Sequence, residues 1–294
     1  SLKKFIVMNT IIDKLRELCE MRQYREVSNL IKNIEEFSGF FKKFDYVTQV
    51  HQLFKEKESI YSELKAQLRE DFISWGQGSC TFTKATMIEA CILVETLGLV
   101  FQKDIIQLMC EIVLKPYNEE FTKPENANLE SVDRRYLWIT RRVREIETLY
   151  EGVFPHYWGL KCFIYHEFCG MTRVHITEIL ETRSIPEVVT LLKALQATMK
   201  FEHKVTNEMK KEFIQYFEEA KKEEKDGKLD LEDELAELDK SQSGKFSIKE
   251  IPEHSREFVI TALPKFKGSI SDSFEQYMKP YVDKEESEIR ENIA

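Results

Sequence analysis

The stretch from Asp239 to Glu250, which reads DKSQSGKFSIKE, has the residue types and spacing of a calcium-binding loop. In such a loop, oxygens at positions one, three, five, seven and twelve surround the ion, and a glycine at position six allows the sharp turn. The ligands would be Asp239, Ser241, Ser243, Glu250 and the backbone carbonyl of Lys245. The pattern supports a calcium-responsive protein as one interpretation.

Three features of the same stretch count against calcium binding. Only two of the five ligands are carboxylates, which predicts weak affinity. Pro252 would interrupt the helix that should leave the loop, and the sequence holds no second loop to pair with this one. We therefore predict no metal site, and keep the loop as the alternative to a chance match in a polar linker.

Two cysteines and a histidine form a second candidate for metal chemistry. Cys162, His166 and Cys169 share one face of a helix, and zinc would need a fourth ligand or a water. The aromatic residues around them favour a core stripe instead. The motifs of P-loop, dinucleotide-binding, HExxH and GxSxG enzymes are absent from the sequence. We predict a protein without a cofactor and without enzymatic activity.

Four arginines surround one tryptophan in a helical stretch: Arg134, Arg135, Trp138, Arg141 and Arg142. Tryptophan and arginine are frequent at the centres of protein interfaces, so we predict a partner surface here. An anionic membrane surface is a second possibility. The alternative is that a neighbouring helix of the same chain covers the tryptophan while acidic residues pair with the arginines.

The composition limits the classes of protein. The 294 residues carry a net charge of −9, which argues against general nucleic-acid binding. There are 10 glycines and 7 prolines, fewer than a protein rich in tight turns normally uses. The six cysteines form no CxxC pair and are interpreted as reduced thiols. No stretch is apolar over the roughly 20 residues that a membrane helix needs.

The elements that must position these residues are helices, because apolar residues recur at steps of three and four. The strongest pattern runs from Val132 to Tyr150, whereas Gly39 predicts the end of an early helix. Ser184 and Glu187 form a capping box. The expected helices cover residues 5–19, 24–37, 46–75, 84–97, 103–121, 132–150, 156–182 and 184–199, with another to about residue 220.

We predict an all-α fold built as an elongated stack of helices. The expected domains are an N-terminal long-helix bundle (1–75), a helical-rod domain (80–220), an acidic flexible linker (221–265) and a C-terminal helical segment (266–294). The linker assignment depends on charge: residues 218–240 contain eleven acidic and five basic residues, a net charge of −6. Helical spacing resumes at Phe266.

Five blocks of sequence resemble one family. Residues 132–141 resemble its D-R-R-Y-x-W-x-x-R signature, and residues 153–158 its F-P-x-x-W turn. Residues 167–173 are similar to E-F-C-x-x-T-R, residues 195–202 to L-Q-x-T-x-x-F-E, and residues 266–285 to F-x-G-x-I-S-x-x-F-E followed by Y-V. The family is the vacuolar protein sorting subunit fifty-three of two tethering complexes, the Golgi-associated retrograde protein (GARP) complex and the endosome-associated recycling protein (EARP) complex.

The resemblance implies a non-catalytic subunit of a multisubunit vesicle tether with a helical-rod (CATCHR) fold. Such a hetero-tetramer of sister subunits acts in retrograde endosome-to-trans-Golgi transport and endocytic recycling. It works with SNAREs and small GTPases at the cytosolic face of the trans-Golgi network and endosomes, as a peripheral membrane complex. Family members are longer at both ends, so the resemblance implies that this chain is one part of the subunit. A generic helical-repeat adaptor remains a further alternative.

Overall fold

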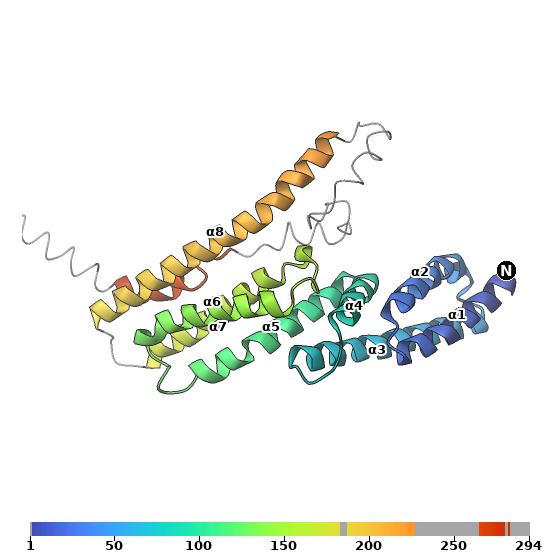
Figure 1. The fold of residues 1–294 in the computed structure, drawn as a ribbon, viewed down its shortest axis with the longest axis horizontal. Helices are drawn as coiled ribbons and strands as arrows, with labels where there is room; N and C mark the ends of the chain where they lie inside the picture. The colour runs from blue at the N-terminus through green and yellow to red at the C-terminus, as the bar shows by residue number, and fades with distance from the viewer. Residues whose placement is uncertain (1, 183–186, 227–264, 280–281, 283–294) are drawn as a thin grey trace, which may run out of the picture. The chain divides into compact units, whose positions relative to one another are not determined.

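The computed structural model describes residues 2–182, 187–226, 265–279 and 282 (Figure 1). Over these residues the chain is helical and contains no strand, which confirms the predicted all-α class. The chain divides into two compact units: unit 1 is Ser1–Lys115 with Arg144–Leu160, and unit 2 is Pro116–Val143 with Lys161–Ala294. No described helix has both the length and the apolar character of a membrane span.

Unit 1 is built mainly from the first four helices of the chain. These are α1 (Leu2–Glu20), α2 (Tyr24–Phe41), α3 (Thr48–Gly76) and α4 (Lys84–Thr96), with the short η1 (Lys42–Phe44) and η3 (His156–Trp158). Helix α2 packs against both α1 and α4. Its apolar residues recur at helical spacing, and the side chains of Tyr24, Val27, Ile31 and Ile34 are at most 1% exposed.

Gly39 does not end α2, contrary to the sequence prediction. The helix continues to Phe41, and η1 follows directly. Phe41 is buried, and its ring lies edge-on to that of Phe5 with 6.3 Å between centroids. Burial of this aromatic residue in the helical conformation outweighs the local preference of a glycine to terminate a helix.

Unit 2 contains the parts that carry the candidate site. It comprises the last turns of α5 (Leu99–Phe121), η2 (Leu129–Ser131), most of α6 (Val132–Leu149), α7 (Leu160–Thr182), α8 (Val188–Asp226) and η5 (Ser271–Phe274). The predicted apolar stripe of α6 is confirmed as core. Its five residues within α6, and Tyr150 directly after the helix, are each at most 7% exposed: Val132, Tyr136, Ile139, Val143, Ile146 and Tyr150.

Several helix boundaries differ from the sequence predictions. Helix α5 begins at Leu99, four residues before the expected start, and α8 is one continuous helix where two were expected. Gly159, at φ 65°, separates η3 from α7 where one helix was expected. Residues 267–270 form turns that lead into η5.

Some predictions fall outside the described residues. They include the capping box, apart from Glu187, and the calcium-like loop. The linker predicted for residues 221–265 also lies outside the described chain, except for residues 221–226, which belong to α8, and residue 265.

Candidate functional site

The predicted arginine and tryptophan cluster lies on α6, but its members have different surroundings. Arg134 and Arg141 are exposed, whereas Trp138 and Arg142 are half-buried. The Trp138 ring lies 5.3 Å from that of Tyr117, both in unit 2, so a helix of the same unit covers part of it. Arg135 is 0% exposed and does not belong to a surface. The partner surface stays a prediction for the four other residues.

The guanidinium of Arg135 is held by four acceptors. Its Nη1 donates to the Tyr117 hydroxyl at 2.9 Å and to His175 Nδ1 at 3.0 Å. Its Nη2 donates to the backbone carbonyls of Phe121 at 3.1 Å and Asn126 at 3.3 Å. Phe121 is the last residue of α5, so the cation also lies at the negative end of that helix. Arg135 thereby fastens α5, the following loop and α7 to α6.

No carboxylate of the described residues lies within ion-pair distance of this guanidinium, so neutral dipoles balance its charge. Its Nε has no hydrogen-bond partner in the described part of the chain. A buried charge held only by dipoles depends on every one of its hydrogen bonds. Loss of a single acceptor therefore leaves part of the charge without compensation.

The hydrogen bonds of His175 define its tautomer. An arginine only donates, so Nδ1 accepts from Arg135, and Nε2 carries the proton that it donates to Asn118 Oδ1 at 3.1 Å. Burial, followed by the charge of Arg135, lowers the pKa of His175, and the opposing effect of Glu178 is smaller. The imidazole is thus held neutral, with both nitrogens engaged, and is poorly placed to act as a general base.

Tyr117 completes the network. Its hydroxyl accepts from Arg135 and forms a second hydrogen bond, of 2.7 Å, with the Thr172 hydroxyl, in which either group can donate. Its ring stacks on the imidazole of His175 at 5.8 Å between centroids. Burial raises the pKa of Tyr117, so the phenol stays protonated. These contacts position side chains and leave no nucleophile.

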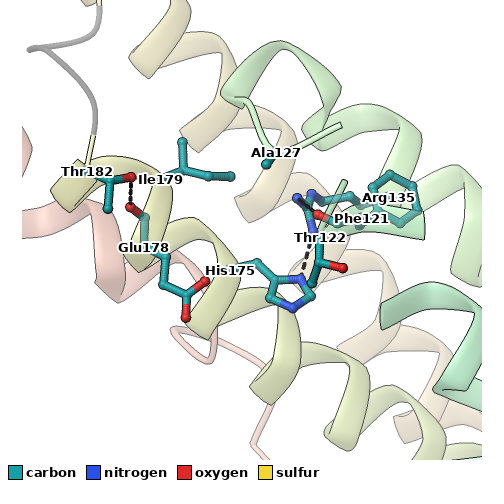
Figure 2. A pocket seen from close by; sticks show the side chains of 8 residues that line it. All are labelled: Phe121, Thr122, Ala127, Arg135, His175, Glu178, Ile179 and Thr182. Atoms are coloured by element: carbon teal, nitrogen blue, oxygen red, sulfur yellow. Dashed lines mark hydrogen bonds between the residues drawn. The ribbon is translucent and has the colours of Figure 1, made fainter. Parts of the chain in front are cut away.

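A pocket of about 250 Å³ lies beside this network (Figure 2). Figure 2 shows Arg135 and His175 joined by a hydrogen bond, with Glu178 and Ile179 farther along the same side of the pocket. Its lining residues are Phe121, Thr122, Ala127, Arg135, His175, Glu178, Ile179 and Thr182. The buried guanidinium is already engaged by its four acceptors, and the exposed Glu178 stands at the pocket, so the arrangement does not select an anion.

A second network joins α8 to the segment that contains η5. The Glu202 carboxylate is 3% exposed and accepts from the backbone N–H groups of Gly268 at 3.0 Å, Ile270 at 2.7 Å and Ser271 at 2.9 Å. The Ser271 hydroxyl donates to it at 2.8 Å. Gly268 has φ 82°, and a Cβ there would meet the Asp272 carboxylate at 2.8 Å. Glu202 was not predicted as a site residue, although it is the last residue of the sequence block at 195–202.

Other residues of these blocks, and the block of residues 153–158, also act in packing. Tyr136 stacks on Phe201 with 4.4 Å between centroids, and its hydroxyl lies 2.6 Å from that of Thr198. In unit 1, Tyr157 and Trp158 both donate to Glu95 Oε1 at 2.7 Å, which fixes the turn after α6 against α4. Each of these hydrogen bonds and ring stacks joins residues of the same unit.

The structure describes only some of the candidate metal ligands. Cys162 and Cys169 are buried and His166 is exposed, and no group of potential metal ligands occurs among the described residues. Asp239, Ser241, Ser243, Lys245 and Glu250 lie outside the described residues. The structure therefore does not test the predicted absence of a metal site there, and calcium binding by that loop stays the alternative.

Comparisons with known proteins agree on one family. The family described as "Vps53, N-terminal" matches residues 1–294. The chain is 25% identical to vacuolar protein sorting-associated protein 53 A of Arabidopsis thaliana, over 100% of this chain and 37% of that protein. It is 24% identical to protein 53 B of the same plant, over 63% of this chain and 33% of that protein. The chain thus spans about a third of the length of these curated relatives. No solved structure matches it.

Proposed function

The chain belongs to the Vps53 N-terminal family, and from that membership we propose that it is the N-terminal part of a subunit of a multisubunit vesicle tether. The observation that carries the proposal is the family match over residues 1–294. The complex would be of the GARP and EARP type, a hetero-tetramer of sister subunits. It would act in retrograde endosome-to-trans-Golgi transport and in recycling, with SNAREs and small GTPases, at the cytosolic face of these membranes.

The packing supports a role without catalysis. Arg135, Trp158 and Glu202 are residues of the family-like blocks whose polar groups form hydrogen bonds that join helices or fix a turn. A subunit that holds other proteins in place needs such joints, whereas an enzyme needs acids, bases or nucleophiles that reach a substrate.

The exposed part of the α6 cluster is the surface that we assign to a sister subunit. Arg134 and Arg141 are exposed, and Leu137 between them is 67% exposed. An apolar residue flanked by two guanidiniums fits an acidic, partly apolar surface of a partner. Trp138 and Arg142, which are half-buried, border it.

The test is recovery of partners by the full-length subunit from its own cells. The variant Arg134→Glu with Arg141→Glu should lose most of the sister subunits, because both charges facing the partner are reversed. A matched control, Lys55→Glu with Arg69→Glu, reverses two exposed charges on α3 and should recover the complex normally.

Two results would contradict the proposal at different levels. Normal recovery by the α6 variant removes this surface but keeps the tether. Recovery of no sister subunits by the unaltered protein, identified by mass spectrometry, removes the tether itself.

A further inference from the structure

Helix α8 carries an apolar stripe that the described residues of its own unit leave exposed. Val188 is 37% exposed, Leu192 38% and Met199 55%, while Leu195 is half-buried. Steps of four, three and four residues separate these four positions. At about 100° per residue they fall within roughly one sixth of the helix circumference. This is the spacing of a helix that packs along another helix.

A different face of the same helix builds the core of unit 2. Leu191, Ala194, Thr198 and Phe201 are at most 5% exposed. The exposed stripe is therefore a second apolar surface on a helix that already contributes these four residues to the core of unit 2. Exposed apolar surface of this kind, bordered by polar residues, is typical of a protein interface.

The helix is basic on the outer side of the stripe. Val189, which is 52% exposed, and Gln196 lie directly beside the stripe. Lys193 and Lys200 lie about 40° farther around the helix, from where their long side chains extend toward a helix packed on the stripe. Both lysines are exposed. Between Val188 and Asn207 the one acidic residue is Glu202, which is buried and engaged by backbone N–H groups. A chain with a net charge of −9 thus presents a local positive edge here.

We propose that the stripe Val188, Leu192, Leu195 and Met199 binds an amphipathic helix of a partner protein, with acidic residues along the edge that faces Lys193 and Lys200. Apolar residues at heptad spacing provide the contact area, and the lysines select the charge and orientation of the partner. A second copy of this chain fits less well, because antiparallel copies would place one lysine edge against the other.

The test uses the purified chain and two labelled helical peptides of roughly three heptads. Both have leucine at the two apolar positions of each heptad. One has glutamate beside them and the other has lysine, so that like charges keep each peptide monomeric. Binding is measured by fluorescence anisotropy. The chain should bind the glutamate peptide at least about tenfold more tightly than the lysine peptide.

Three variants separate the apolar and charged contributions. Leu192→Gln with Met199→Gln should abolish binding of the glutamate peptide. Lys193→Glu with Lys200→Glu should reverse the preference between the peptides. Val174→Gln, which removes an exposed apolar residue of α7, should change nothing. Thermal unfolding of each variant should match that of the wild-type chain, because all five positions are exposed.

Three results would overturn the inference. These are absence of binding, equal binding of both peptides, and a wild-type chain that sediments as a dimer while the Leu192→Gln, Met199→Gln variant sediments as a monomer. The last result would assign the stripe to a second copy. The α6 surface proposed for the sister subunit takes no part in this experiment, so failure of one proposal leaves the other standing.

Discussion

Arg134 and Arg135 are adjacent residues of the same type, yet one guanidinium faces solvent and the other is 0% exposed. Helical spacing places Arg135 at the border of the apolar stripe, where a side chain can be either buried or exposed. The acceptors that bury it come from 9 to 40 residues away along the chain. Sequence reasoning could predict the cluster, but it could not tell which arginine is structural, because that choice depends on the end of α5 and on α7.

Arg135→Lys should destabilise unit 2 by about 2–3 kcal/mol. A lysine brings one nitrogen in place of two, so acceptors now bound to a cation would lose their donor, and such bonds are worth about 1.5–3 kcal/mol each. Urea unfolding followed by circular dichroism measures the change. The matched control is the neighbouring Arg134→Lys, which should stay within about 0.5 kcal/mol of wild type. Equal stability of the two variants would contradict a structural role for Arg135.

The segment from Phe266 to Phe274 shows how an element can escape a periodic pattern. Its apolar spacing predicts a helix, but the chain first forms turns, with Gly268 at positive φ. These turns aim three N–H groups at one carboxylate, an arrangement that apolar spacing cannot reveal.

The α6 stripe was predictable because its burial follows from a repeat within a single helix. The continuity of α8 was not, because the pattern alone does not show whether adjacent helical stretches join.

Glu202→Ala should release the segment that contains η5 from α8 without unfolding the rest of unit 2. The variant removes the acceptor of four hydrogen bonds, so the free energy of local opening should fall by about 2–3 kcal/mol. Hydrogen exchange at the amides of Gly268, Ile270 and Ser271 measures this opening. Glu187→Ala, at an exposed glutamate, should leave the exchange unchanged. Wild-type protection in the Glu202 variant would show that the segment is held by other contacts.

At the scale of the whole molecule, the apolar stripe of α6 crosses from one unit to the other. Val143 belongs to unit 2, and Arg144 begins the part of α6 that belongs to unit 1. The sequence predicted the all-α class and the family because both follow from patterns that run along the chain. The division into units could not be predicted in this way. The apolar period of α6 continues unchanged past Val143, so it does not show which residues of the helix belong to which unit.

The two units should respond differently to acid. His175 of unit 2 has a pKa below its usual value of about 6.5, so the unfolded state binds its proton first as the pH falls. The stability that the neutral imidazole provides is complete above about pH 6.5. It declines below that value until the folded state is also protonated, by at most about 1.4 kcal/mol per pH unit.

Hydrogen exchange between pH 7.5 and pH 5.5, corrected for intrinsic rates, should show loosening around His175 that exceeds any change in unit 1. In His175→Asn this excess should vanish, because the titrating group is gone. His203→Asn, at an exposed histidine of α8, should keep it. An unchanged pH response in His175→Asn would assign the acid sensitivity to other groups.

The bonds to Glu202 also have a consequence for chain length. They join residues 66 to 69 positions apart, so the intervening chain is a closed circuit whose ends meet at one carboxylate. The entropy lost on closing a circuit grows with the logarithm of its length, so doubling a flexible stretch adds only about 0.6 kcal/mol. The closure of this circuit therefore depends more on the glutamate and its three amides than on the number of residues between them.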